Sequence, residues 1–473
     1  MDLSGIKYIH LIAVCGMGMG SLAGLLKSSG YLVSGSDEQF YPPMNLQLQE
    51  LGIDLKLGYK PENLHPNPDL VIVGNAVSKG NPEVEETLAR GLPYMSLPQA
   101  LAEFYLKGKH PIVIAGTHGK TTTSALISWL LEVGGMEPGF MIGGIVKNYD
   151  RSYKVGQGKY FVVEGDEYDS AFFDKRPKFF HYQASIAIIT GIEFDHADIY
   201  QDLAEIKKAF AQFILSLPEQ GRMLACGDDN NLRGLIEQEL AGKVRCKIES
   251  YGLDAKDGWQ ARDIRFDQSG GHFVILRNGE PVCELHSPLW GRHNIQNIVA
   301  AIGVAHGVGV AWDKIEEGLK TFKGVKRRQE IVAETNGVII VDDFAHHPTA
   351  VRETIRAINA RFPNRRLWAV FEPRTNTSRR NIFQEAYRQA FDGAKKIIIA
   401  DVYRPDKIKD EERFLPEKLA EDLRNKGKEA LHISGISNIL ATLCQHLIPG
   451  DVVLIMSNGS FDHLPYKLAA ELA

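Results

Sequence analysis

Short apolar runs recur through the first hundred residues, and each is followed by glycine or polar residues. The runs at 8–14 and 31–36 have the length and composition of buried parallel strands. A glycine turn at 15–20 follows the first run, and the apolar pattern at 21–29 predicts a helix. Asp37 lies about 20 positions after the turn, which is the outline of a dinucleotide-type βαβ unit. The alternative is that the glycines serve only close packing of helix on strand.

A third apolar run at 70–74 leads into Asn75, Ala76 and Ser78. These polar and small residues would lie at the carboxyl end of a strand, where open parallel sheets bind ligands. The first unit is therefore predicted to carry a binding site at this edge.

The middle of the chain repeats the alternation around a glycine loop. The apolar run at 111–114 precedes the loop 115–123, and a helical apolar pattern at 124–131 follows it. Further apolar runs at 160–163 and 185–189 predict two more parallel strands. This order of strand, glycine loop and helix is typical of a nucleotide-binding unit.

Acidic residues follow both of those later strands, at 164–169 and 191–196. The stretch 246–290 predicts short antiparallel strands, with a hairpin turn at Asn278-Gly279. The run 291–297 then begins a helix rich in alanine and valine.

The last part of the chain predicts a further doubly wound α/β unit. Apolar runs at 338–341, 367–371, 396–401 and 452–456 alternate with helical patterns. The first, second and fourth of these runs end in polar clusters, and the polar segment 324–328 reads as a linker or hinge. We therefore expect an α/β protein with three domains, at residues 1–108, 109–322 and 323–473.

Composition excludes several classes of function. The 473 residues are 44% hydrophobic and 24% charged, with a net charge of −5, so there is no basic surface that predicts nucleic-acid binding. The apolar stretch 9–26 is too rich in glycine for a membrane span and lacks a convincing cleavage site for a signal peptide. Five scattered cysteines predict neither a disulfide framework nor a zinc cluster, and they fit a reducing cytoplasm.

The glycine loop carries the strongest chemical signal. A helix N-terminus after such a loop points backbone N–H groups at an anion. Lys120 would reach terminal phosphates, and the Thr121 hydroxyl would hold Mg²⁺. The spacing differs from the standard eight-residue Walker pattern, because Gly116 lies only three residues before Gly119. A glycine turn with a surface lysine is the alternative, but it leaves the three consecutive threonines at 121–123 unexplained.

Two strand ends would supply metal ligands. Glu164 would bind Mg²⁺ beside Thr121, since Mg²⁺ prefers one or two protein oxygens together with phosphates. His196 would bind a second Mg²⁺ or orient a carboxylate, although histidine is an unusual magnesium ligand and a structural role is the alternative. The pair His346-His347 predicts either a zinc site or a cap for the helix after Pro348.

Basic residues of the last unit allow two interpretations. The run 326–328 is either a solvated linker or a phosphate contact. Arg374, Arg379 and Arg380 would clamp carboxylates bidentately, with surface solvation as the alternative for at least one of them.

In combination, the segments 116–123, 291–297 and 342–348 identify a resemblance. The chain resembles the ATP-dependent Mur ligases of peptidoglycan synthesis along nearly its whole length. The segments 164–176 and 457–459, together with 34–37 and 41–44, are similar to the branch that attaches a tripeptide in murein recycling.

The resemblance implies a role for each candidate residue. The first domain would bind the UDP-sugar rather than NAD, the second would bind ATP and two metal ions, and the third would bind nucleotide and the incoming peptide. Implied UDP-sugar contacts are Gly16, Met17, Gly18, Met19, Asp37, Asn75, Ala76 and Ser78. Implied ATP contacts are Gly116, Thr117, His118, Gly119, Lys120, Thr121, Thr122, His293, Asn294, Asn297, Arg328, Asp343 and His346. Implied metal ligands are Thr121, Glu164 and His196, implied catalytic residues are Lys120, Glu164 and His196, and implied peptide contacts are Arg374, Ser378, Arg379, Arg380, Ser457 and Asn458.

The implied reaction joins the tripeptide L-alanyl-γ-D-glutamyl-meso-diaminopimelate to UDP-N-acetylmuramate through an acyl phosphate, with ATP and Mg²⁺. Two departures from related branches matter. Ser378 stands where the alanine-adding relatives carry arginine, which leaves room for a longer amine, and no lysine stands out as the carbamoylated metal ligand of other branches. An L-alanine ligase is the nearest alternative. A nucleotide-sugar-binding protein without catalysis is disfavoured by the complete set of candidate catalytic residues, and a folylpolyglutamate-type ligase would not need the first domain.

Overall fold

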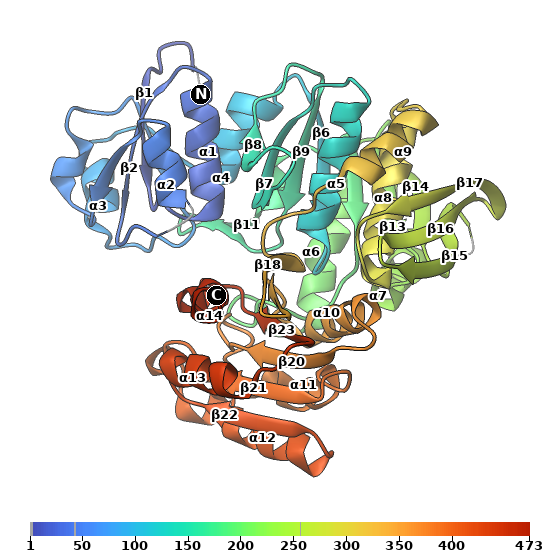
Figure 1. Cartoon of the computed structure of the whole chain (residues 1–473). Helices are drawn as coiled ribbons and strands as arrows, with labels where there is room; N and C mark the ends of the chain where they lie inside the picture. Colours follow the sequence, from blue (N-terminus) through green and yellow to red (C-terminus); the bar gives the residue numbers. More distant parts are fainter. Residues whose placement is uncertain (1–2, 42–43, 256) are drawn as a thin grey trace.

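Three large β-sheets, formed one after another along the chain, organise the molecule (Figure 1). A computed structural model describes residues 3–41, 44–255 and 257–473. The predicted α/β architecture in three units is confirmed. Pro42 and Pro43, which belong to the family-like segment 41–44, lie outside the described residues.

The first sheet is parallel throughout, with strand order β3-β2-β1-β4-β5. Its order reverses at β1, which pairs with both β2 and β4, and ligands bind outside the carboxyl ends of strands at such a point. The strands are β1 (Tyr8–Ile12), β2 (Leu32–Asp37), β3 (Asp54–Leu57), β4 (Leu70–Val73) and β5 (Tyr94–Ser96). The helices are α1 (Met17–Ser28), α2 (Met44–Glu50), α3 (Pro82–Ala89) and α4 (Leu97–Leu101).

Helix α1 begins earlier than the helix predicted at 21–29. The residues of the predicted glycine turn enter its first turn, so that the connection from β1 is only residues 13–16. Gly20 has to be glycine there, because a Cβ atom would lie 2.3 Å from the side chain of Met44. The glycines therefore allow close packing as well as a sharp strand-to-helix connection.

The second sheet has ten strands in the order β17-β16-β15-β14-β13-β12-β6-β9-β7-β8. Its centre is parallel, with β6 between β12 and β9, so the loop after β6 opens between the ends of both neighbours. The strands are β6 (His110–Ala115), β7 (Gly139–Val146), β8 (Arg151–Lys154), β9 (Tyr160–Gly165), β12 (Ile186–Ile189), β13 (Arg222–Cys226), β14 (Lys247–Gly252), β15 (Trp259–Asp267), β16 (Gly270–Arg277) and β17 (Glu280–Ser287). The helices are α5 (Lys120–Val133), α6 (Leu203–Ser216), α7 (Asn230–Gly234), α8 (Arg292–Gly307) and α9 (Trp312–Thr321).

The prediction of antiparallel strands over 246–290 is right for β15 to β17 and wrong for β14. Strand β14 pairs in parallel with β13 and β15, so the parallel sheet extends one strand further than its sequence pattern indicates. The predicted hairpin at Asn278-Gly279 joins β16 to β17, with φ angles of 52° and 85° at its two residues.

The third sheet has the order β18-β19-β23-β20-β21-β22 and is parallel except for the edge strand β18. The strands are β18 (Glu330–Thr335), β19 (Val338–Asp343), β20 (Arg366–Phe371), β21 (Lys396–Ala400), β22 (Glu429–Ile433) and β23 (Asp451–Met456). The helices are α10 (Pro348–Arg361), α11 (Gln384–Ala390), α12 (Pro416–Asn425), α13 (Ile436–His446) and α14 (Leu464–Glu471). The loops after β19, β20 and β23 therefore meet at one edge of the sheet.

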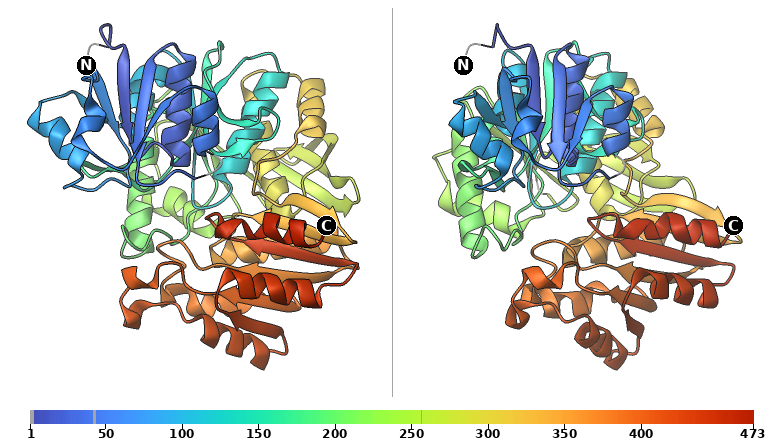
Figure 2. Two further views of the ribbon diagram at one scale, coloured as in Figure 1. Left: turned by 60° about the vertical axis from the view of Figure 1, so that its left-hand side comes forward. Right: turned by 90° about the vertical axis from the view of Figure 1, so that its left-hand side faces the viewer.

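The first two units share a continuous apolar core, whereas the third has cores of its own. Helix α1 lies against β7 and β8 (Figures 1 and 2). The Tyr153 ring packs on Gly24 at this contact. The small hairpin β10 (Asp169–Ala171) and β11 (Asp174–Pro177) also reaches the first unit, where Phe173 stacks edge-on with Tyr94. The third unit meets the second through α10, which contacts α8 and β15, and through loops around the cleft. Because its apolar cores are separate from that of the other two units, the third unit is the one best placed to move.

The segment 324–328, interpreted as a linker, is docked on the second unit. Val325 bridges Val146, and Lys326 N donates to Ile145 O over 2.9 Å. Gly324 has a φ of 84°, which favours glycine at the turn into the third unit. Within the described residues, no helix is long and apolar enough to cross a membrane.

Candidate functional site

All three units line one continuous cleft of about 2400 Å³. This volume exceeds the range of about 300–1,000 Å³ that suits a single small ligand. The cleft is lined by every candidate UDP-sugar residue and by every candidate ATP residue except Gly116, whose place is the floor of the loop. Thr121, Glu164 and His196 also line it, and so do Arg374 and Asn458 of the candidate peptide set. Ser378, Arg379, Arg380 and Ser457 do not.

The loop between β6 and α5 has the form that phosphate binding requires. Gly116 and Gly119 have φ angles of 122° and 81°. A Cβ atom on Gly116 would lie 2.3 Å from Thr190 Oγ1, and one on Gly119 would lie 2.5 Å from Asn297 Oδ1. The loop therefore tolerates only glycine at both positions, and α5 begins directly at Lys120 with its N-terminus facing the cleft.

Lys120 lies at the centre of a buried group of charges. Its ammonium donates to Gly116 O over 2.7 Å and to Glu167 Oε2 over 3.1 Å, and Asp166 lies 3.9 Å away. Burial disfavours the charged ammonium, but the carboxylates of Glu167 and Asp166 outweigh it and raise the pKa of Lys120. The lysine is thus held fully charged at the mouth of the loop.

Thr121 and Glu164, the predicted pair of oxygen ligands, lie within hydrogen-bond distance of each other. The Thr121 hydroxyl donates to Glu164 Oε2 over 3.2 Å, and Gly143 N donates to Glu164 Oε1 over 2.6 Å. Burial and the neighbouring Asp166 carboxylate raise the pKa of Glu164. The ionised form of Glu164 is therefore unfavourable in the protein alone. A bound cation would stabilise it by offsetting the repulsion between Glu164 and Asp166.

His196 comes from the loop after β12 and has a φ of 54°. Its Nε2 lies 3.4 Å from Glu167 Oε1, and its backbone N–H donates to Asp195 Oδ1 over 2.7 Å. Burial opposes protonation of the ring, but Glu167 and Asp195 outweigh it and raise the pKa of His196 to about 9. Glu167 thus links His196 to Lys120, a connection that the sequence did not predict.

The start of α8 forms a second wall of the cleft. Asn294 Nδ2 donates to Trp290 O over 2.8 Å, and Asn297 Nδ2 donates to Asn294 Oδ1 over 3.3 Å. His293 Nε2 lies 3.1 Å from Gln329 Nε2, whereas its buried Nδ1 finds no hydrogen-bond partner among the residues that the structure describes. A buried nitrogen of this kind, on the cleft wall, fits recognition of a base.

The basic run 326–328 divides between three environments, so neither interpretation holds for all of it. Lys326 pairs with Asp150 at the surface, 2.9 Å away. Arg327 donates to the main chain of Ser457 and Gly459 inside the third unit. All three residues line the cleft, and Arg328 reaches the phosphate loop, where it donates to Thr121 Oγ1 over 3.1 Å. Arg328 therefore connects the third unit to the phosphate loop.

Asp343 holds the loops around the cleft in place. Its carboxylate accepts the backbone N–H groups of Gln329, over 2.7 Å, and of Ala345, over 2.8 Å. The Phe344 ring lies 4.5 Å from the Arg328 guanidinium, which fixes the direction of that arginine.

The two histidines before α10 differ in role. His346 Nε2 faces Asp195 Oδ2 over 3.8 Å, from the third unit to the second. His347 is the N-cap of α10, and its Nδ1 accepts the N–H of Thr349 over 3.2 Å. Capping, the second of the two alternatives for this pair, is thus realised by His347.

The candidate UDP-sugar site lies at the switch point of the first sheet. Asp37 Oδ2 accepts the N–H of Cys15 over 2.8 Å, and burial raises the pKa of Asp37. Tyr41 of the first unit and Arg374 of the third unit line the same cleft. Burial raises the pKa of Tyr41, and the positive charge of Arg374 opposes this rise. The first and third units therefore face each other over the cleft.

Arg374 is the candidate peptide contact that the geometry favours most. Its guanidinium lies 3.7 Å from the centre of the Tyr403 ring and 3.4 Å from Glu372 Oε1. Gly459 has to be glycine, because a Cβ atom would lie 1.9 Å from Arg374 Nε. Asn458 Oδ1 is buried without a hydrogen-bond partner within the part of the chain that the structure describes. The side chains of Arg374 and Asn458 both line the cleft and are able to bind a polar substrate.

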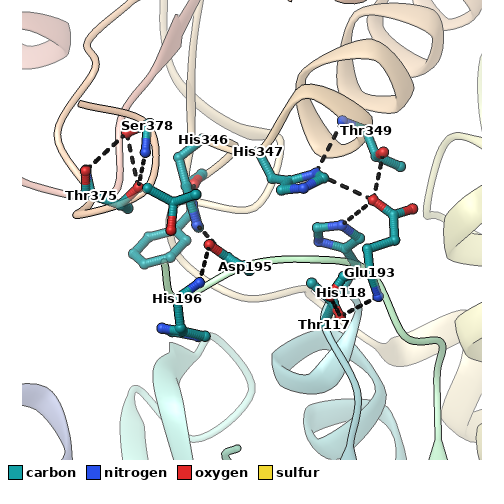
Figure 3. Close-up of polar contacts among 12 residues, drawn as sticks. Thr117, His118, Glu193, Asp195, His196, His346, His347, Thr349, Thr375 and Ser378 are labelled. Atoms are coloured by element: carbon teal, nitrogen blue, oxygen red, sulfur yellow. Dashed lines mark hydrogen bonds and ion pairs between the residues drawn. The ribbon is translucent and has the colours of Figure 1, made fainter. Parts of the chain in front are cut away.

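Ser378 does not face the cleft, in contrast to the expectation that its small size opens the peptide site directly. The side chain is 2% exposed. Its hydroxyl oxygen accepts the N–H of Arg374 over 3.0 Å. It also accepts the N–H of Thr375 over 2.9 Å (Figure 3). Arg379 donates to Tyr403 O over 3.2 Å, and Arg380 donates to Asn376 O over 2.9 Å, so both arginines brace the same loop.

We expect Ser378→Arg to impair use of the peptide by disturbing this loop. An arginine has no room at a buried, fully bonded position, and overpacking typically costs about 1–3 kcal/mol. The KM for the peptide amine should rise while the KM for ATP stays unchanged, and thermal unfolding should report the loss of stability. An unchanged KM for the amine would show that the loop does not shape the peptide site.

Several charged residues in and around the cleft were not predicted individually from the sequence. Glu167 and Asp166 were recognised only as part of an acidic strand end, and Glu193 only as part of another. Lys178 donates to Asp166 Oδ2 over 3.0 Å and to Tyr168 OH over 2.9 Å, inside the cleft. No spacing signal marks Lys178, because a hairpin separates it from the strand it supports.

Three family models match successive parts of the chain. They are described as "Mur ligase family, catalytic domain" for residues 8–108, "Mur ligase middle domain" for residues 114–305, and "Mur ligase, glutamate ligase domain" for residues 327–459.

Characterised relatives are similar along their whole length. The chain is 40% identical over 467 residues to the UDP-N-acetylmuramate–L-alanyl-γ-D-glutamyl-meso-2,6-diaminoheptandioate ligase of Escherichia coli strain K12, with 98% of each chain covered. It is 33% identical to the UDP-N-acetylmuramate–L-alanine ligase of Acetivibrio thermocellus, with 97% and 95% covered. The crystal structure of a murein peptide ligase from Psychrobacter arcticus 273-4 has 33% identity and a TM-score of 0.74, with 98% of each chain covered.

Proposed function

The chain belongs to the Mur ligase family, and from this premise we propose that it joins the tripeptide L-alanyl-γ-D-glutamyl-meso-diaminopimelate to UDP-N-acetylmuramate at the expense of ATP. The observation that carries the proposal is the 40% identity, from end to end, to a ligase of that name. The common cleft supports it, because three substrates require one space that all three units reach.

We assign one substrate to each unit. Residues 1–108 bind UDP-N-acetylmuramate, residues 109–322 bind ATP, and residues 323–473 bind the incoming peptide and close over the nucleotide. The reaction consumes ATP and the chain carries five unpaired cysteines, so we place the enzyme in the cytoplasm.

The reaction proceeds through activation of a carboxylate. An oxygen of the lactoyl carboxylate attacks the γ-phosphorus of ATP, the bond to the β-phosphate oxygen breaks, and ADP leaves. The peptide amine then attacks the acyl carbon, phosphate leaves, and the amine gives up a proton. Lys120 and the N-terminus of α5 stabilise the negative charge that gathers on the transferred phosphoryl group.

Magnesium fits the oxygen pair of Thr121 and Glu164, with His196 beside a second position. When bound, Mg²⁺ offsets the repulsion between carboxylate and phosphates. The protein residues orient the substrates: Arg328 reaches the Thr121 hydroxyl from the segment that joins the second and third units, and its guanidinium lies against the Phe344 ring of the third unit. Closure also excludes water, which would otherwise hydrolyse the acyl phosphate.

We expect the tripeptide to be used at least about 100-fold more efficiently than L-alanine, as a ratio of kcat/KM, because a site built for charged groups strongly rejects an amine that lacks them. Phosphate release should be measured with UDP-N-acetylmuramate, ATP and either amine. Each single omission is the control, since a ligase needs all three substrates.

The second candidate is an L-alanine ligase, favoured by the relative of that name at 33% identity. Equal or better efficiency with L-alanine would overturn the assignment to recycling and leave the ligase chemistry intact. Phosphate release that needs neither amine would instead point to a nucleotide-sugar-binding protein with residual ATPase activity.

A further inference from the structure

A trio of potential metal ligands joins the second and third units outside the magnesium site. His118 belongs to the phosphate loop, Glu193 to the loop after β12, and His347 to the start of α10. One ligand atom from each lies within 4.8 Å of the other two. Figure 3 shows both rings and Thr349 gathered around the Glu193 carboxylate. We propose that these three residues form a site for a transition-metal cation such as Zn²⁺.

The distances suit a tetrahedral site. Glu193 Oε2 lies 3.3 Å from His118 Nε2 and 3.4 Å from His347 Nδ1. Zinc bonds of about 2.0–2.1 Å at tetrahedral angles place neighbouring ligand atoms about 3.3 Å apart. Two of the three edges therefore have the required length, and the ligand atoms of the two histidines lie within 4.8 Å of each other.

The tautomer of His347 is fixed by its neighbours. Its Nε2 lies 3.2 Å from the carbonyl oxygen of Phe194, which only accepts, so Nε2 carries the proton. Its Nδ1 receives the N–H of Thr349, so Nδ1 carries a lone pair. Glu193 Oε2 lies 3.4 Å from the same nitrogen, so two acceptors stand close together, and a bound cation would take the lone pair in place of the N–H of Thr349. A cation between them turns this repulsion into attraction.

The surroundings support two of the three ligands in the manner of metal sites. A metal-binding histidine usually donates its other ring N–H to a carbonyl or carboxylate, as His347 does to Phe194. The Glu193 carboxylate is oriented by the Thr349 hydroxyl, 2.8 Å away. Glu193 is itself held to the phosphate loop, since its backbone N–H donates to Thr117 Oγ1 over 2.8 Å.

The donor set is one carboxylate and two imidazoles. Two imidazoles favour zinc or cobalt over magnesium.

The site would act on closure of the enzyme. Its ligands come from two units that have to separate when product leaves, so a bound ion would hold the third unit against the second. His118, Glu193 and Thr349 line the cleft, which gives the ion a path of entry and an open fourth position. Zn²⁺ is therefore expected to bind the intact protein and to slow its turnover.

The first test is a zinc titration of the full-length protein against a chromophoric chelator. His347→Asn keeps an N-cap side chain for α10 while it removes the ligand nitrogen. We expect this variant to bind one equivalent of Zn²⁺ with an affinity lower by at least about 100-fold. Loss of a group that only supports a ligand already lowers metal affinity by about 10–100-fold. Thr349→Val should weaken the same equivalent by about 10-fold. His286→Ala, in the surface pair with His272, is the matched control and should bind as the wild type does.

The second test uses wild-type crystals and does not depend on any variant. Crystals exposed to Zn²⁺ should show an anomalous scattering peak between His118, Glu193 and His347. A peak only near Glu164 and His196, or unchanged zinc affinity of every equivalent in His347→Asn, would overturn the proposal and leave the trio as a hydrogen-bonded contact between units.

Discussion

Replacement of Lys120 by alanine is expected to lower turnover by about 10²–10³-fold, which is the typical loss when one electrostatic contact to the reacting group is removed. The Lys120 ammonium lies at the N-terminus of α5 and donates to Gly116 O over 2.7 Å. It would leave this carbonyl group to contact a phosphate. In the free enzyme Glu167 holds it, 3.1 Å away. Phosphate release at saturating substrates is the measurement.

The control for this change is Lys154→Ala, which removes a partly buried lysine paired with Glu132 outside the cleft lining. It should leave turnover close to that of the wild type. Because Glu167 loses a buried partner in Lys120→Ala, circular dichroism has to show that this variant is folded. Near-normal turnover in a folded Lys120→Ala protein would refute the assignment of the phosphate loop.

The phosphate loop was predictable from sequence because its signal is local. Gly116, Gly119 and Lys120 lie within five residues, and a strand and a helix flank them. The ends of β9 and β12 were predictable for a related reason, since parallel strands deliver their carboxyl ends to one edge. Glu164 accordingly meets Thr121 across the neighbouring strands.

Contacts between units were not predictable in the same way. Glu193 lies 3.4 Å from His347, although 154 positions separate them, and no periodicity links two loops of different sheets. The direction in which a loop side chain points was also not predictable from the sequence. Ser378 was expected to open the peptide site, but the loop that contains it folds inward around its hydroxyl group. A residue type limits the chemistry of a position, whereas the turn geometry decides which way the side chain points.

Glu164→Gln is expected to lower magnesium-dependent turnover by at least about 100-fold. Loss of the metal ligand removes several kcal/mol of stabilisation of the charge in the transition state. The free protein should nevertheless be as stable as the wild type or more stable. Burial and Asp166 raise the pKa of Glu164, so its ionised form at neutral pH costs stability in the folded state. Glutamine does not ionise, and its amide oxygen still accepts the N–H of Gly143.

Glu249→Gln is the matched control, because the same change should have the opposite effect on stability. Burial opposes ionisation of Glu249, but Arg222, which donates to it over 2.6 Å, outweighs this and lowers its pKa to about 2. Its charge therefore stabilises the fold above the ordinary pKa of glutamate, and glutamine loses that contribution. Glu249 lies outside the cleft lining, so the dependence of rate on Mg²⁺ concentration should not change.

Rates at a series of Mg²⁺ concentrations and thermal unfolding of the free protein separate these two effects. His196→Ala should also raise the Mg²⁺ requirement, but it should lower stability because it removes a partner from the buried Glu167. Wild-type dependence on Mg²⁺ in both Glu164→Gln and His196→Ala would mean that these residues serve structure alone. A fall in the stability of Glu164→Gln equal to that of Glu249→Gln would mean that Glu164 is a structural carboxylate rather than one kept charged for a cation.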